Sequence, residues 1–198
     1  MKIFVSKVLA SSAYNSGMLK YQLDSDVGVI RIGDIQKIND SLNLTTYYSF
    51  AIRDRSSRIE PIPTSIIEKY ENVQIGDDVF VLGYPTSIGL QRSPQFDPER
   101  PLLRKGAIAG KNVAKKTIII DCPVYYGNSG GPVIVQYSES FSTYYKLIGV
   151  VSEFVPYEED WVNTKNGLTN ISITNSGYSV VVPIESILYL FNSKKSSP

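Results

Sequence analysis

The chain is divided into many short runs of β-branched residues separated by turn-forming residues, and this pattern limits the folds available to it. Six such runs, bounded by Gly, Pro, Asn and Asp, cover residues 27–32, 79–82, 117–120, 133–135, 147–151 and 179–182. No long amphipathic helices alternate with these runs, which argues against a parallel, doubly wound sheet. We therefore expect an all-β sandwich or barrel.

Two segments have helical rather than strand features. Residues 63–70 begin with a helix-capping pattern, and residues 183–191 begin with Pro183 and then place apolar side chains at helical spacing. The second segment is predicted to pack as a terminal helix. Three other stretches are predicted to be loops or linkers, namely residues 53–63, 86–104 and 156–177, the last as a long, exposed excursion.

Composition excludes several classes of protein. A chain of 198 residues with 42% apolar and 20% charged residues suits one moderate domain or two small ones and is too apolar for disorder. Its 20 basic and 19 acidic side chains give a net charge of +1, so a nucleic-acid-binding surface is not indicated. With 1 Cys, the chain forms no intrachain disulfide and no thiolate zinc site.

No stretch provides the roughly 20 consecutive apolar residues that a membrane span needs. The first 13 residues faintly resemble a signal peptide, but Lys7 interrupts their apolar part. Ile3, Val5 and Lys7 fit one face of a strand equally well. The sequence therefore leaves both a cytoplasmic and an extracytoplasmic location open.

One glycine-rich segment carries residues suited to chemistry. Ser129 lies in the sequence GNSGGP, residues 127–132, shortly after one β-branched run and directly before another. Glycines on both sides permit a sharp turn that pushes a hydroxyl outward. They also leave main-chain N–H groups free to bind the negative oxygen of a tetrahedral acyl intermediate. An ordinary glycine-rich hairpin uses the same residue types, whereas a phosphate-binding loop fits less well because no Lys follows the glycines.

The segment GNSGGP resembles the nucleophile loop of trypsin-like, chymotrypsin-fold serine peptidases. Four further segments are similar, in order, to strands of the disulfide-free bacterial members such as the high-temperature-requirement proteases: residues 73–85, 103–108, 145–152 and 177–183. The resemblance implies an all-β fold of two antiparallel β-barrels with a short C-terminal helix.

The same resemblance implies that the first barrel is incomplete. Residues 1–58 are then its remnant, residues 59–72 a linker with a short helix, and residues 73–192 the second barrel with the nucleophile and the C-terminal helix. Residues 193–198 are a polar tail that we expect to be frayed.

The family pattern also implies roles for individual residues. Ser129 is the nucleophile, and the N–H groups of Gly127 and Ser129 form the oxyanion hole. Asp26 directly precedes a strand with the family's pattern and is the implied acidic member of the triad, which orients an imidazole. Asp24, two residues earlier, competes for that role.

A primary specificity pocket follows from the same alignment of motifs. Pro123, six residues before the nucleophile, lies at its base, and Ser152, Glu153 and Phe154 line one wall. An uncharged base does not support selectivity for Arg or Lys. Phe154 narrows the pocket, so we expect a small apolar substrate residue, although Glu153 could attract a basic one. No cofactor and no metal ion are expected.

The family's general base is missing from this sequence. The chain contains 0 His, and the family's His lies upstream of the Asp, where only 25 residues precede Asp26. We expect a chain that starts late, with about half of the first barrel absent and the His supplied by a missing N-terminal segment. A Lys base is not expected, because no Lys falls where the fold would place one beside Ser129.

Two hypotheses follow. In the first, the chain is part of a serine endopeptidase that hydrolyses polypeptides through an acyl-enzyme on Ser129 and is inactive alone. In the second, it is a pseudopeptidase that binds extended peptides by strand addition along residues 149–154 without cleaving them. The intact GNSGGP loop favours the first, because pure binding has no physical need for a nucleophile and oxyanion-hole positions.

Overall fold

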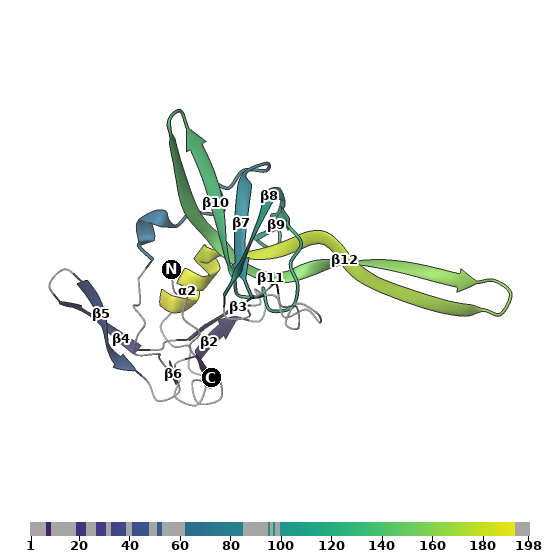
Figure 1. Cartoon of the computed structure of the whole chain (residues 1–198), viewed down its shortest axis with the longest axis horizontal. Coiled ribbons are helices and arrows are strands. Elements are labelled where there is room, and N and C mark those ends of the chain that lie inside the picture. Colours follow the sequence, from purple (N-terminus) through teal and green to yellow (C-terminus); the bar gives the residue numbers. More distant parts are fainter. Residues whose placement is uncertain are drawn as a thin grey trace. The chain divides into compact units, whose positions relative to one another are not determined.

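The computed structural model describes residues 7–8, 19–22, 27–30, 33–38, 41–47, 51–52, 62–84, 95, 97 and 100–192 (Figure 1). The chain divides into two compact units, the first comprising Met1–Ile67 with Glu185–Pro198 and the second comprising Glu68–Ile184. This grouping places the C-terminal helix with the N-terminal strands, whereas the sequence pattern assigns it to the second barrel. The predicted boundaries at residues 58, 72 and 192 stay predictions.

The first unit contains three antiparallel strand pairs. They are β1 (Lys7–Val8) with β6 (Ala51–Ile52), β2 (Leu19–Gln22) with β3 (Val27–Ile30), and β4 (Gly33–Ile38) with β5 (Ser41–Tyr47). Among the described residues these pairs are separate two-stranded sheets. The strand predicted from residue 27 is confirmed.

The two predicted helices differ in outcome. The terminal helix is confirmed as α2 (Ile184–Asn192), whereas residues 63–70 form only a 3₁₀ turn at Thr64–Ile66. That turn ends because Ile67 adopts an extended backbone, with φ −80° and ψ 133°. Neither helix in the described part of the chain has the length and apolar character that crossing a bilayer requires.

The second unit is built on a closed, six-stranded antiparallel barrel with the strand order β10-β11-β12-β9-β8-β7 (Figure 1). Its strands are β7 (Asp78–Gly83), β8 (Leu102–Asn112), β9 (Thr117–Asp121), β10 (Pro132–Glu139), β11 (Ser142–Asn163) and β12 (Leu168–Pro183). The pairing of β10 with β7, in which Val133 lies opposite Val81, closes the ring. All five runs predicted as strands in this unit are confirmed, and so is the all-β fold class.

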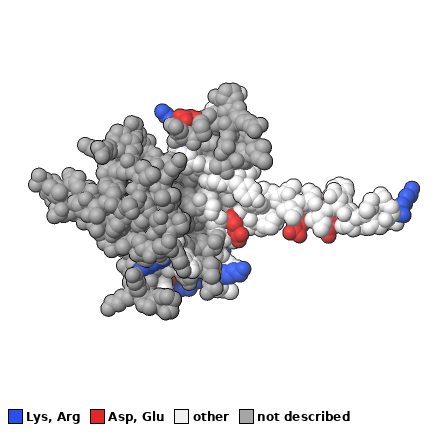
Figure 2. All heavy atoms as spheres, turned by 90° about the horizontal axis from the view of Figure 1, so that it is seen from below, with Lys and Arg blue, Asp and Glu red and all other residues white. Residues whose placement is uncertain are grey.

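Strands β11 and β12 continue beyond the barrel as a long hairpin, called the arm (residues 156–175), which Figures 1 and 2 show as a narrow projection. The sequence correctly predicts exposure in this segment, but the prediction of a loop is wrong. The connecting turn is specified locally: Gly167 has φ +70°, and its N–H donates to the Asn163 carbonyl oxygen at 2.8 Å. The Asn163 side-chain oxygen accepts from the Lys165 N–H at 3.0 Å, and the Asn166 side-chain oxygen accepts from the Leu168 N–H at 3.2 Å, so two asparagines stabilise the hairpin turn.

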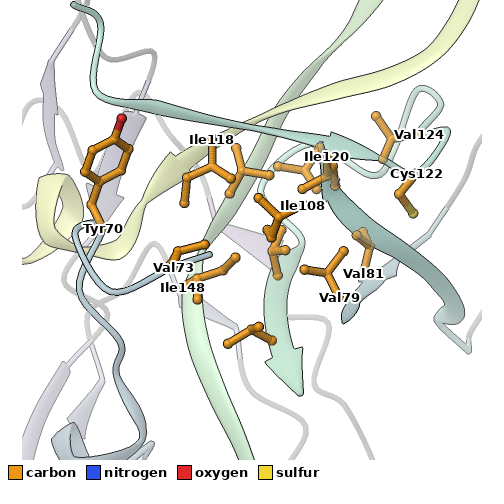
Figure 3. Packing of buried hydrophobic residues seen from close by; sticks show 14 residues of the cluster. Tyr70, Val73, Val79, Val81, Ile108, Ile118, Ile120, Cys122, Val124 and Ile148 are labelled. Carbon is orange, nitrogen blue, oxygen red and sulfur yellow. The ribbon is translucent and has the colours of Figure 1, made fainter. Parts of the chain in front are cut away.

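The barrel interior is filled by small β-branched side chains (Figure 3). Alternate residues of β7 and β9 point inward, so that Val79, Val81, Ile118 and Ile120 are fully buried. Further members from other elements include Val73, Ile108, Val133, Val135, Ile148, Val151 and Val181. This core holds β9 and β10 in place, and the loop that carries Ser129 connects these two strands.

Two barrel glycines lie where neighbouring backbone leaves no room for a side chain. A Cβ on Gly106 of β8 would clash with the Asp121 carbonyl oxygen, and one on Gly149 of β11 would clash with the Val182 carbonyl oxygen. Gly110, also in β8, has nothing within 4 Å of its Cβ position. The close approach of strands therefore requires glycine at positions 106 and 149.

We expect Gly106→Ala to destabilise the fold by about 1–3 kcal/mol, because the added methyl group must displace backbone. Gly110→Ala on the same strand is the matched control and should be neutral or stabilising by up to about 1 kcal/mol. Urea denaturation of both variants measures the difference. Equal stabilities of the two variants would contradict the close packing of β8 against β9 at Gly106.

Candidate functional site

The loop between β9 and β10 holds Ser129 at the surface. Ser129 is exposed, while its neighbour Asn128 is 1% exposed. Gly127 and Gly130 have positive φ angles of 91° and 80°, a conformation that favours glycine. The glycines on either side of the serine therefore produce the sharp turn that the sequence predicts, and they direct residue 128 inward and residue 129 outward.

Main-chain hydrogen bonds tie this loop to β11. The Gly130 N–H donates to the Val151 carbonyl oxygen at 2.7 Å, and the Val151 N–H donates to the Gly131 carbonyl oxygen at 2.9 Å. Within the loop, the Asn128 N–H donates to the main-chain carbonyl oxygen of Tyr125. The Gly131 N–H donates to the main-chain carbonyl oxygen of Asn128, and both distances are 2.9 Å. In the part of the chain that the structure describes, the N–H groups of Gly127 and Ser129 donate to no backbone carbonyl.

Asn128 and Gly131 determine how closely the loop approaches β7. The Asn128 side chain packs on Gly83, where a Cβ would lie 3.1 Å from the Asn128 Cγ atom. A Cβ on Gly131 would clash with the Leu82 carbonyl oxygen. The Asn128 Oδ1 atom is buried and has no hydrogen-bond partner among the described residues. Asn128 thus acts through shape and burial, and the loop sits as close to β7 as backbone permits.

Two polar side chains of β12 support the segment that leads into the loop, and the sequence interpretation does not identify them. The fully buried Ser179 donates from Oγ to the Cys122 carbonyl oxygen at 2.8 Å. Asn175 donates from Nδ2 to the Val124 carbonyl oxygen at 2.6 Å. A signal for Ser179 exists in the sequence, because two-residue periodicity places it on the same inward face as Val181, where a hydroxyl needs a partner.

The residues assigned to a specificity pocket come from the segment before the loop and from β11. Ser152, Glu153 and Phe154 follow Val151 on β11, where the register with β12 shifts between Val151 and Glu153. Pro123 and Phe154 are half-buried, and Glu153 is exposed. The Phe154 ring meets the Tyr126 ring edge to face, with centroids 6.2 Å apart and an interplanar angle of 87°. Tyr126, which precedes Gly127, is thus an additional residue of this region that the sequence interpretation does not identify.

The other implied residue, Asp26, lies outside the described residues, as does Asp24. The described part of the chain holds no group of three or more His, Cys, Asp or Glu side chains able to bind a metal ion. The structure therefore brings together the loop residues and the β11 residues but gives no geometry for the acidic member of the triad.

Cys122 lies at the start of the loop segment and is 1% exposed. Burial raises the pKa of its thiol; the nearby Arg104 guanidinium lowers that pKa, and the Asp121 carboxylate raises it. The Arg104 guanidinium also stacks over the Tyr125 ring, 4.9 Å from its centroid. Because a raised pKa disfavours the thiolate, Cys122 is a packing residue rather than a nucleophile.

Removing the Ser179 hydroxyl should weaken the support of the loop. We expect Ser179→Ala to lower the free energy of unfolding by about 1–3 kcal/mol, because it leaves the Cys122 carbonyl without its buried donor. Ser138→Ala, at an exposed position of β10, is the control and should change stability by less than about 0.5 kcal/mol. Chemical denaturation gives both values, and indistinguishable variants would argue against a supporting role.

The only thiol provides a further test. We expect an aromatic disulfide reagent at pH 8 to modify native Cys122 at least about 100-fold more slowly than the urea-unfolded chain, because burial raises the thiol pKa and blocks access. The reaction is followed by the absorbance of the aromatic thiolate that the reagent releases. Equal rates in native and unfolded protein would show that this segment is open.

A family match covers the N-terminal part of the chain, the loop with Ser129 included, and ends before β11. The sequence model of a family described as a trypsin-like peptidase domain matches residues 2–140, a range that includes Ser129. Among solved structures, a match is found to the HtrA-type protease AlgW with a decapeptide, at 19% identity and a TM-score of 0.37. That match covers 64% of this chain but 31% of the solved chain, so this chain spans less than a third of that length. No curated protein matches the chain.

Proposed function

Because the chain belongs to the trypsin-like peptidase domain family, we propose that Ser129 is the nucleophile of a serine endopeptidase site that cleaves polypeptides through an acyl-enzyme. One observation carries this proposal: an exposed Ser129 stands in a turn where the N–H groups of residues 127 and 129 have no backbone acceptor among the described residues. A purely structural turn has no need of both features.

The proposed oxyanion hole consists of the N–H groups of Gly127 and Ser129. The hydrogen bonds to Val151 and within the loop engage the N–H groups of residues 128, 130 and 131. The two remaining N–H groups, which have no backbone acceptor within the described ranges, are available to the negative oxygen that develops when Ser129 attacks a carbonyl carbon. Donors fixed before the reaction stabilise that charge without reorganisation.

The proposed site lacks its general base within this sequence, which contains 0 His. A serine hydroxyl is a poor nucleophile at neutral pH unless a base accepts its proton. In a subtilisin-type triad, loss of the His alone lowers kcat by about 2 × 10⁶-fold. We infer that this chain by itself has no appreciable peptidase activity and that Asp26 would orient an imidazole supplied from outside this sequence.

The proposed substrate is an extended polypeptide lying along β11 beyond Val151, at residues 152–154, because the main chain of residues 149–151 already bonds to β10, β12 and the glycine loop. Pro123 offers no charge at the base of the pocket, and the Tyr126–Phe154 ring pair reduces the room beside it. A small apolar side chain at the cleavage position fits this arrangement best. The exposed carboxylate of Glu153 would favour a basic residue at a neighbouring substrate position.

A second candidate is a pseudopeptidase that binds extended peptides without cleaving them. The complete absence of His favours it, since binding by strand addition needs no proton acceptor. The two candidates differ in one respect that can be measured, namely whether Ser129 reacts when a base is provided.

A fluorophosphonate probe makes that measurement. Alone, the chain should label at least about 10⁵-fold more slowly than a complete serine protease, because no group deprotonates Ser129. Added imidazole should raise the labelling rate in proportion to its concentration in the wild type but not in Ser129→Ala. Mass spectrometry of the modified peptide locates the label.

Each other outcome has a meaning. Rapid labelling of Ser129 without imidazole would contradict the missing base. Labelling that never responds to imidazole, in a chain that still binds an extended peptide, would overturn the peptidase proposal in favour of the pseudopeptidase.

A further inference from the structure

The arm is a two-stranded ribbon with two free edges. From Pro156 paired with Asn175 to Asn163 paired with Leu168, its strands pair only with each other among the described residues. Side chains at positions 156–170 are all exposed. An isolated two-stranded ribbon is marginally stable in water, and each of its edges presents unpaired main-chain groups that can accept another strand.

The two edges of the arm carry opposite kinds of side chain. The β11 edge includes three consecutive acids, Glu158, Glu159 and Asp160, and Figure 2 shows acidic groups along the projection. The β12 edge, residues 168–175, has the sequence LTNISITN and contains no charge, no Pro and no Gly. Charged residues and Pro are the usual protection of a free edge, so β11 is protected and β12 is not.

Apolar groups lie on one face beside this unprotected edge. Ile171 and Ile173 are 60% and 61% exposed, and their register partners Asp160 and Glu158 share that face. Val162, two residues after Asp160, lies on the same face and is 60% exposed. The isoleucines therefore form an aliphatic stripe along β12 that nothing among the described residues covers.

We propose that the β12 edge of the arm binds the same edge of a second copy of this chain, in an antiparallel pair around a two-fold axis near Ser172. In that register Ile171 lies opposite Ile173 of the second copy, twice, and the two ribbons become one four-stranded sheet. A two-fold contact of this kind is self-complementary, because each copy presents the same neutral strand.

Charge selects this arrangement over the alternatives. Pairing through β11 would bring three carboxylates of each copy together, which repels. In the β12 pairing these acids lie on the two outer strands, where they keep further copies from adding. The assembly therefore closes at two chains. The contact is small by the standards of stable dimers, so we expect a dissociation constant in the micromolar range.

Sedimentation velocity over a concentration series tests the proposal. The wild type should shift from monomer to dimer, and Ile173→Lys should weaken the dimer at least about tenfold, because it puts a charged side chain opposite Ile171 of the second copy at both ends of the contact. Val162→Lys is the matched control, because it adds the same charge at equal exposure on the same face but on the outer strand. It should leave the dimer intact.

Cross-linking tests the register separately. Ser172→Cys should form a disulfide between copies under mild oxidation, since residues on the two-fold axis face each other at bonding distance. Glu159→Cys, whose residue pairs with Ser172 within one chain, should not, and the native Cys122 is buried. A monomer at every concentration, equal effects of the two Lys variants, or cross-linking through residue 159 would each overturn the proposal. The proposal would also be overturned if the chain stayed monomeric and bound an added cationic peptide along the acidic β11 edge of the arm.

Discussion

A pair of main-chain hydrogen bonds between the glycine loop and β11 is the constraint on which the candidate site depends. The Gly130 N–H and the Gly131 carbonyl both bond to Val151, a residue that is 1% exposed and belongs to the barrel core. Because these bonds join an exposed loop to a buried strand, the packing of the core fixes the position of Ser129. The loop cannot move away from β11 without breaking its two hydrogen bonds to Val151.

The same constraint decides which main-chain donors remain available. The bonds to Val151 and within the turn occupy the N–H groups of residues 128, 130 and 131, and glycine at position 131 leaves room for the nearby Leu82 carbonyl oxygen. On the other side, Ser179 and Asn175 hold the segment that enters the turn. The position of this loop is therefore set by hydrogen bonds to main-chain groups, and no charged side chain is needed to hold it.

The sequence predicts more of the barrel than of its extensions. Dense β-branched runs define the barrel strands, and paired glycines indicate the turn at Ser129, because both signals are local. The arm escapes prediction because its acids and asparagines are typical of loops. Its side chains at positions 156–170 are also exposed on both faces, so no alternation of buried and exposed residues indicates the pairing. Tyr126 is missed because its partner, Phe154, lies far along the chain. For Ser179 the inward-facing position is readable from periodicity, but the distant Cys122 carbonyl that it supports is not. Asp26 lies outside the described residues and stays a prediction.

Hydrogen exchange of individual loop amides, followed by NMR, tests the central claim most directly. The amides of Asn128, Gly130 and Gly131 should exchange slowly because they donate to carbonyl oxygens, whereas those of Gly127 and Ser129 should exchange at nearly the rate of an unstructured chain. Protection of all five amides would place the loop in a continuous hydrogen-bonded ladder. The loop would then have no donors left for an oxyanion, and the proposed role of Ser129 would be contradicted.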